Sequence, residues 1–315
     1  MSKQTTKSTE KKLVYLKGER SAHIEKKVNE LGSWQFFKYL YSKDTKTSMK
    51  IIGLNFIMLL VMVPLYVIFL NNTVLSQSNL ISNMPVDGSF LAGEGFWFGA
   101  QAYVDGLSLD FAVNTGMWFA IIIIACTFLF AGGFAVIRDS FWTGELVILK
   151  TFFKGIAQAA PIMLPFMIIV AGLFMIIFIA GTFLQTVMAS WLATVITVIL
   201  WILFVLIAMY VMMLFSVVVT HKQTLRVNMS DAWLLYKTSF VANLLNFILA
   251  FAPVVVFALT NNGSGQSFFV LLLTMFMFMM GLFYIVFVWQ VHMMKTFRLY
   301  NPVEKKVVKK GKKHA

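Results

Sequence analysis

The 315-residue chain is 59% hydrophobic and only 12% charged, whereas a soluble domain is about 45–50% apolar and about 25% charged. One water-soluble core of this length cannot hide that much apolar surface, so the composition excludes an ordinary soluble protein. The net charge of +13 suits an anionic membrane surface or nucleic acid. A single cysteine, Cys126, excludes an intrachain disulfide.

Residues 1–48 form a basic N-terminal segment that precedes the first apolar run. The segment lacks a short apolar core followed by a small-residue cleavage site, so we expect no cleavable signal peptide. Residues 31–41 combine aromatic side chains with Lys38, which predicts a short helix lying on the inner leaflet of the membrane.

Six apolar runs are long enough to cross a bilayer, which takes about 20 mostly apolar residues. Backbone amides in lipid must hydrogen-bond within their own segment, so we expect these runs to be helices. Weak polar breaks at 181–186 and 261–267 divide the two longest uncharged stretches. The predicted spans cover about 49–70, 116–137, 157–180, 190–219, 240–260 and 268–292.

Residues 71–115 would form the only sizeable segment on the outer side. Within it, residues 90–104 are fairly apolar, but they are too short to span and contain Glu94. We expect an interfacial or partly folded element there. The fold class is therefore an all-α polytopic membrane bundle over residues 49–293, followed by a basic tail at 294–315.

The positive charges predict the orientation of the bundle. Residues 1–50 hold 12 of the 26 Lys and Arg, the tail from Lys295 holds eight, and two connections hold three each. With six spans, all four segments lie on one side, which the positive-inside rule assigns to the cytoplasm. Both termini would then be cytoplasmic. The Lys-rich termini would contact anionic inner-leaflet lipids, and this explanation leaves no need for nucleic acid as a partner.

The connection between the second and third spans is the most informative segment. Arg138 ends the second span, Gly144 can break the helix, and Glu145 follows. We expect the next residues to form an amphipathic elbow helix under the membrane, and a similar elbow to precede the fifth span at 226–238. The candidate cytoplasmic interface consists of Arg138, Gly144, Glu145, Lys150, Phe152 and Lys154.

Within that set, Arg138 and Glu145 form our candidate interface pair at the elbow. The alternative is that Arg138 only anchors a helix end to the lipid headgroups.

The run FAVIR, then GE, then KTFFK, at residues 134–154, resembles the signature segment of the YesL-type family, small integral membrane proteins of Gram-positive bacteria. The resemblance covers about residues 116–250. It departs at Ala131-Gly132-Gly133, where that family usually has Pro-Ala-Thr. The resemblance implies an accessory membrane role linked to carbohydrate uptake, with a membrane transporter as partner.

No catalytic, cofactor-binding or metal-binding residues are predicted. The four histidines lack metal-ligand spacing, and we find neither a phosphate-binding loop nor a nucleophile elbow. We therefore favour a non-enzymatic accessory or regulatory membrane protein. The alternatives are a permease subunit of an ATP-driven transporter, for which Glu145, Gly155 and 162–165 partly echo the docking loop, and a membrane enzyme.

Overall fold

The computed structural model describes residues 31–43, 46–60, 62, 65, 68, 94–221, 223–261 and 275–299, and every regular element among them is helical. A helix at Thr47–Leu60 lies between the first two labelled elements. The labelled elements are α2 (Ser33–Lys43), α4 (Glu94–Thr143), α5 (Leu149–Val187), α6 (Ser190–Thr220), α7 (Leu225–Thr238), α8 (Phe240–Asn261), η2 (Met277–Gly281) and α10 (Leu282–Leu299).

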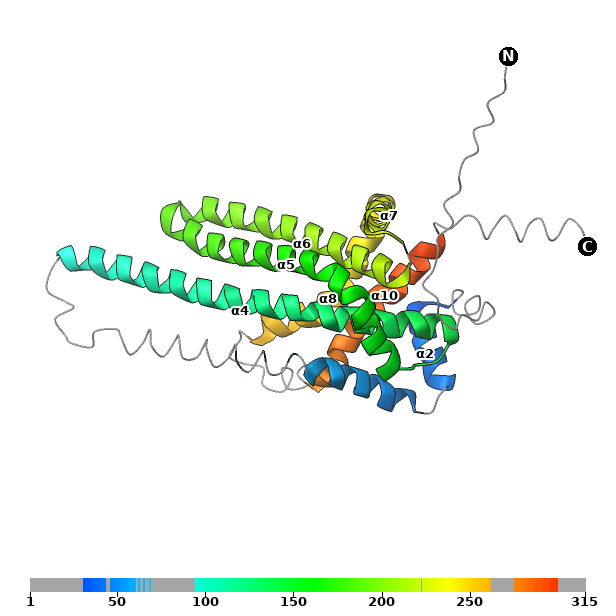
Figure 1. The fold of residues 1–315 in the computed structure, drawn as a ribbon. Helices are drawn as coiled ribbons and strands as arrows, with labels where there is room; N and C mark the ends of the chain where they lie inside the picture. Colours follow the sequence, from blue (N-terminus) through cyan, green and yellow to red (C-terminus); the bar gives the residue numbers. More distant parts are fainter. Residues whose placement is uncertain are drawn as a thin grey trace, which may run out of the picture.

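The three longest helices, α4, α5 and α6, run side by side along most of the molecule (Figure 1). The turn between α5 and α6 lies at one end, which we call the hairpin end. The turn after α4, the C-terminus of α6 and the C-terminus of α10 lie toward the opposite end, which we call the Arg138 end (Figure 1). The 50 residues of α4 correspond to about 75 Å of helix, more than twice the thickness of a bilayer core of about 30 Å.

Three helical segments are long and apolar enough to cross a membrane: Ala112–Thr143, Leu149–Leu184 and Ser190–Thr220. A fourth is added if the bent pair α7 and α8 forms one span. Among the described residues, this number of apolar helices indicates a membrane protein. Each of the three contains one of the predicted spans at 116–137, 157–180 and 190–219.

Two boundaries differ from those predicted. Helix α4 begins at Glu94, so part of the segment at 71–115 continues directly into the span instead of forming a separate element. Helix α5 continues through the polar break at 181–186 and ends at Val187. Within the helix the Thr182 hydroxyl donates back to the carbonyl of Phe178 (3.4 Å), and the chain turns at Met188, whose backbone is extended.

Small residues let α4 and α5 approach closely. Gly132 lies against the buried ring of Phe152, and a Cβ atom on Gly132 would overlap that ring. A Cβ atom on Gly155 would lie 2.6 Å from the carbonyl oxygen of Ala131 and would also overlap Ala135. Small side chains at such crossings are typical of helix packing in membranes. Ala131 and Gly132, which depart from the YesL-type pattern, therefore have a packing role in this chain.

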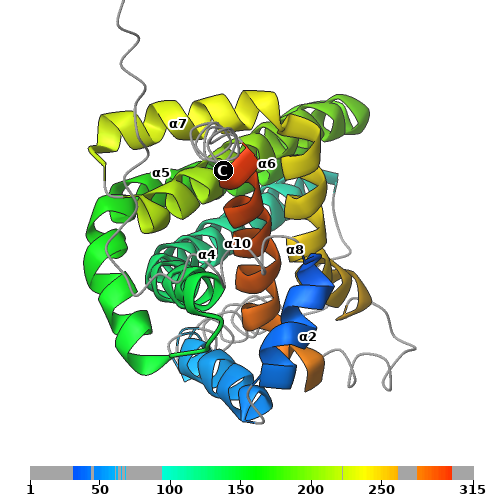
Figure 2. The same ribbon diagram turned by 90° about the vertical axis from the view of Figure 1, so that its right-hand side faces the viewer.

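The start of α5 and the whole of α7 run across the long axis of α4. In Figure 2, α4 is seen nearly end-on, while α7 and the first turns of α5 cross the view. Helix α5 contains Pro161 and Pro165, and proline inside a helix removes a backbone hydrogen bond and bends the axis. Helix α7 and the following segment Phe240–Pro253 meet at 95°. The two predicted elbows are thus helical, and the second is a separate helix.

Helix α10 packs against α4, α8 and α6. The π-helical turn η2 precedes it, and the backbone N–H of Phe283 donates to the buried side chain of Asn55 (3.0 Å). A π turn shifts the backbone hydrogen bonds, and Asn55 satisfies one donor near it. Helix α10 extends to Leu299, beyond the predicted end of the sixth span at 292, and the break at 261–267 lies outside the described residues except for Asn261.

Helix α2 confirms the helix predicted at 31–41. Its Phe36 ring is fully buried and packs against Phe141 and Phe287, with ring centres 5.4 and 5.8 Å apart. Trp34 and Tyr41 remain more than half exposed. Helix α2 therefore joins the protein core on one face, and its contact with the inner leaflet stays a prediction for the other face.

Candidate functional site

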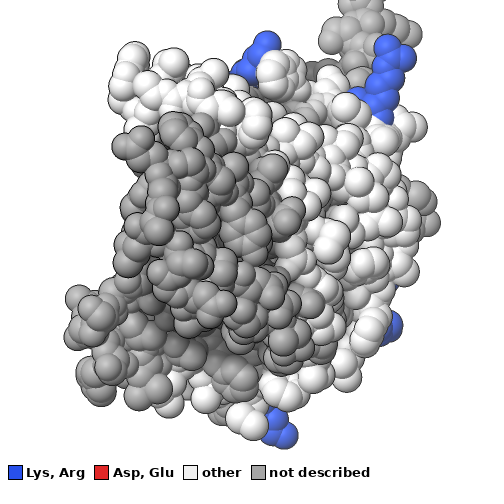
Figure 3. All heavy atoms as spheres, turned by 90° about the vertical axis from the view of Figure 1, so that its left-hand side faces the viewer, with Lys and Arg blue, Asp and Glu red and all other residues white. Residues whose placement is uncertain are grey.

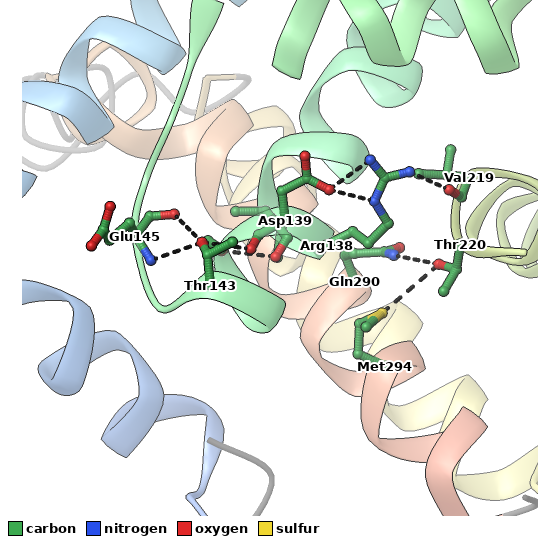
Figure 4. A network of polar contacts seen from close by, with 10 residues as sticks. Arg138, Asp139, Thr143, Glu145, Val219, Thr220, Gln290 and Met294 are labelled. Atoms are coloured by element: carbon green, nitrogen blue, oxygen red, sulfur yellow. Dashed lines mark hydrogen bonds and ion pairs between the residues drawn. The ribbon is translucent and has the colours of Figure 1, made fainter. Parts of the chain in front are cut away.

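Arg138 is a buried cation within a network of polar contacts where α4, α6 and α10 end (Figure 4). It lies near the C-terminus of α4 and is only 3% exposed. Its Nη2 and Nε atoms lie 2.6 and 2.7 Å from Oδ1 of Asp139, and Nη1 donates to the carbonyl of Val219 (2.6 Å). The guanidinium carbon also lies 5.0 Å from the ring centre of Trp142. A buried charge is stable only when paired and hydrogen-bonded, and Arg138 has both kinds of contact.

The contact with Val219 joins two long helices. Val219 precedes the last residue of α6, and the last four carbonyl groups of a helix have no partner within it. A helix C-terminus also carries partial negative charge, which favours a cation there. Arg138 on α4 therefore satisfies an unpaired carbonyl of α6 and holds the ends of the two helices together.

A second set of polar contacts joins α10 to α6. The Gln290 side chain donates to the hydroxyl of Thr220 (3.3 Å), which in turn contacts the sulfur of Met294 (3.8 Å; Figure 4). One turn deeper, the indole N–H of Trp289 donates to the hydroxyl of Ser216 (3.1 Å). Gln290, Trp289, Ser216 and Thr220 are all fully buried, so these bonds form away from water and fix α10 against α6.

A third contact connects α10 to α8 and α7. A ring nitrogen of His292 lies 2.8 Å from Oδ1 of Asn243, and the Asn243 amide donates to the carbonyl of Leu235 (3.2 Å). Leu235 belongs to the last turn of α7, and its carbonyl also accepts the backbone N–H of Ser239 (3.1 Å), the residue between α7 and α8. Asn243 therefore stabilises the sharp bend between α7 and α8.

The turn after α4 explains Gly144 and Glu145. Gly144 has φ of 72°, a conformation that glycine adopts readily and that commonly ends a helix. Thr143 donates to the carbonyl of Asp139 (2.9 Å) and accepts the backbone N–H of Glu145 (3.2 Å). The carboxylate of Glu145 is exposed and lies on the far side of Thr143 from the guanidinium (Figure 4). The ion-pair partner of Arg138 is its chain neighbour Asp139.

The predicted interface residues divide into two groups. Arg138, Gly144 and Phe152 are buried and hold the helices together, whereas Glu145, Lys150 and Lys154 are exposed. Val147, Leu149 and Phe153 lie between these exposed residues in the sequence, and their apolar side chains are 48–62% exposed. We call the exposed charged and apolar residues together the elbow surface: Glu145, Val147, Leu149, Lys150, Phe153 and Lys154.

Sequence reasoning missed most of the polar contacts that join the helices at the Arg138 end. Asp139 carried a signal, because an adjacent Arg-Asp pair at the end of an apolar run allows an ion pair. Gln290 and Asn243 also carried one, as polar residues inside stretches free of formal charge. The carbonyl of Val219 carried none, because its role depends on how α6 ends beside α4.

No group of three or more His, Cys, Asp or Glu side chains in the described part of the chain is placed to hold a metal ion. No family model, no curated protein and no solved structure matches this chain. The resemblance to the YesL-type family therefore rests on the sequence motif alone. The fold and the site define a helical membrane protein in which Arg138, Asn243 and Gln290 join different helices through buried polar contacts.

Proposed function

We propose that the chain is a non-enzymatic accessory protein of the bacterial plasma membrane, with six spans and both termini in the cytoplasm. Its elbow surface would be the docking site for a membrane transporter. The observation that carries the proposal is the set of buried polar contacts around Arg138, beside which the chain exposes a surface of mixed charged and apolar side chains.

The surface of α5 and α6 supports placement in lipid. Near the hairpin end these helices expose large apolar side chains, among them Ile176 (64%), Trp191 (71%) and Val198 (51%). Seen from that end, the described surface is uncharged apart from Lys and Arg side chains at its rim (Figure 3). A soluble protein rarely exposes so many large apolar side chains on neighbouring helices, whereas lipid tails would cover them.

The charge distribution supports the orientation. The described cations Lys150, Lys154 and Arg226 follow the turns at the Arg138 end. Acyl chains around the exposed apolar side chains of α5 and α6 and anionic headgroups at the Arg138 end would match this distribution. Spans one and six include residues outside the described part of the chain, so the total of six spans rests on the sequence.

The contacts of Arg138 support an accessory role over catalysis. A catalytic cation must reach a substrate, but the Arg138 guanidinium contacts Asp139, Val219 and Trp142 and is shielded from solvent. The link with carbohydrate uptake comes from the YesL-type resemblance. Gly155, part of the permease-like echo, is buried in the α4–α5 crossing, so helix packing accounts for it.

Site-specific photo-crosslinking in living cells tests the docking site. A photoreactive phenylalanine analogue replaces Phe153 on the elbow surface or, as a matched control, Phe183 near the hairpin end, since the two side chains are 60% and 51% exposed. We expect position 153 to crosslink a transport protein and position 183 to yield no such product. Crosslinking only to lipid at position 153 would contradict the docking role.

Lysine substitutions give a second arm of that experiment. Lys150→Glu and Lys154→Glu should each weaken the crosslink because they reverse exposed charges, while Gln158→Glu, an exposed position further along α5, should have less effect.

Thiol labelling of cysteines placed in the two termini tests orientation: we expect labelling only after the cells are opened. Labelling in intact cells would overturn the topology.

A further inference from the structure

Helix α7 has three distinct sides. Asn228, Ala232 and Leu235 are buried against the protein. Leu225, Met229 and Trp233 follow one another at intervals of four residues and are 39%, 38% and 49% exposed. Residues spaced by four lie on one side of a helix, so these three form a continuous apolar stripe. We call it the α7 stripe.

A basic edge runs beside the α7 stripe. Arg226 and Lys237 are both exposed, and their separation of 11 residues is close to three full helical turns, which places them on the same edge. The Lys237 ammonium lies 4.8 Å from the ring centre of Trp233. This contact holds the charge at the border of the apolar stripe, as amphipathic side chains do at membrane interfaces.

The α7 stripe faces the lipid-exposed flank of α6. The Tyr210 hydroxyl on α6 donates to the carbonyl of Met229 (3.3 Å), and the Tyr236 hydroxyl on α7 contacts the carbonyl of Leu206 (3.5 Å). The Trp233 and Tyr236 rings stack with centres 5.6 Å apart. On α6, the nearby large apolar side chains are 40–54% exposed: Ile202, Leu203 and Ile207.

The direction of α7 fits a helix lying in the plane of a membrane. It crosses the view in Figure 2, in which α4 is nearly end-on, and the segment Phe240–Pro253 leaves it at 95°. Its 14 residues include Arg226, Asp231 and Lys237, and charged side chains are rare inside the hydrocarbon layer. Tyr and Trp, by contrast, are enriched at headgroup depth.

We propose that α7 is an interfacial anchor of the inner leaflet. The α7 stripe inserts below the headgroups, and Arg226 and Lys237 bind the phosphate groups of anionic phospholipids. Apolar area and cations on one helix form the chemistry that recognises an anionic lipid surface. The inference rests on the proposed cytoplasmic position of the Arg138 end, and it assigns the membrane, not a protein, as the occupant of this surface.

Spin-label depth measurements in nanodiscs of phosphatidylcholine and phosphatidylglycerol test the anchor. Cys126→Ser provides the background, and single labels are placed by Met229→Cys, Trp233→Cys or, on the opposite flank, Thr238→Cys. We expect labels at 229 and 233 to be reached by oxygen at shallow bilayer depth. The label at 238 should be reached by an aqueous nickel complex. Size-exclusion profiles confirm that each labelled protein is folded.

Two results would overturn the anchor. If labels at 229 and 233 are reached by aqueous nickel as readily as 238, the stripe faces water and awaits a protein. If all three labels lie at the bilayer centre, α7 is half of a broken span. A label at Ile176→Cys separates this inference from the proposed function. If aqueous nickel reaches the label at 176, the proposed multi-pass membrane protein is contradicted. If the label at 176 lies in lipid while the label at 233 is reached by aqueous nickel, only the anchor is contradicted.

Photoactivatable phosphatidylglycerol, present as a minor lipid in phosphatidylcholine nanodiscs, tests the two cations. We expect Arg226→Gln or Lys237→Gln to lower the labelling yield on α7 about fivefold each, since a cation near an anionic leaflet contributes about that factor. Lys154→Gln, an exposed cation on another helix, should leave the α7 yield unchanged. Equal yields from Arg226→Gln, Lys237→Gln and the unmodified chain would exclude headgroup binding by these residues.

Discussion

The Arg138 end and the hairpin end are built from the same long helices but are held together differently. At the Arg138 end, buried polar side chains on α4 and α10 bind α6 through defined atoms. At the hairpin end, α5 and α6 meet mainly through aromatic rings, such as Phe174 with Trp201 at 5.4 Å. One end is specified by directional bonds and the other by shape and surroundings, so the same kind of substitution should act differently in each.

Arg138→Leu should produce the largest effect at the Arg138 end. It leaves the carbonyl of Val219 and the carboxylate of Asp139 without their cation. Breaking a fully buried ion pair costs about 3–5 kcal/mol, and because the Asp139 side chain is 22% exposed we expect a loss at the lower end of that range. Thermal unfolding in detergent measures the loss. Lys154→Leu, which removes an exposed cation, should change stability by less than about 0.5 kcal/mol. Equal shifts from the two variants would show that Arg138 does not hold the helices together.

Ile176→Lys tests what surrounds the hairpin end. The side chain is 64% exposed, so in water the substitution would be nearly neutral. In lipid, a lysine at the middle of a span costs about 2.5–3.5 kcal/mol on insertion scales, and the cost is smaller nearer the end, where Ile176 lies in the predicted span at 157–180. We therefore expect reduced membrane insertion in an in vitro translocation assay, with Ile176→Leu as the control. Normal insertion of the lysine variant would contradict a lipid-facing surface.

Gly155→Ala and Gly172→Ala compare two glycines of the same helix. At Gly155 the new methyl group would meet Ala135 and the backbone of Ala131, whereas no atom lies within 4 Å at Gly172. Overpacking costs about 1–3 kcal/mol, while alanine in an open helical position gains up to about 1 kcal/mol over glycine. Opposite shifts in melting temperature are expected. If both variants shift the melting temperature in the same direction, the close contact of Gly155 with α4 is contradicted.

The sequence predicted the helical class and the middle of the long helices well, because hydrophobic runs of the right length have few alternatives in lipid. It also located Gly144 as a helix end and 226–238 as a separate elbow. Helix ends inside apolar regions were harder to predict. Gly181 and Thr182 lie within α5, and the break at Met188 has no distinctive composition.

The candidate site was harder still, because its bonds join residues far apart in the chain. Arg138 was identified from its place at the end of an apolar run, yet its bond to Val219 connects positions separated by 81 residues. The backbone carbonyl of Val219 looks the same in every sequence. Only the position of the α6 C-terminus beside α4 makes that carbonyl a partner for Arg138, and no local pattern encodes such a placement.

His221 should produce the smallest effect, and it extends the comparison to pH. It follows the last residue of α6, is 3% exposed, and packs edge-on against Phe297 with ring centres 4.9 Å apart. Burial lowers its pKa from 6.5 to about 4, although a hydrogen bond to the Val217 carbonyl acts in the opposite direction. The neutral ring is therefore the form that fits the folded Arg138 end.

Because the folded state holds the lower pKa, the unfolded chain takes up the proton first as the pH falls below about 6.5. Between pH 7 and about pH 5.5 the His221 contribution should reduce the free energy of unfolding by about 1 kcal/mol. His221→Gln removes this titration, so its melting temperature should fall less over the same interval, whatever its value at pH 7. Parallel pH profiles for the two proteins would mean that the ring is protonated equally in both states. The Arg138 end would then be open to water at this position, and the contrast with the hairpin end would rest on Arg138 alone.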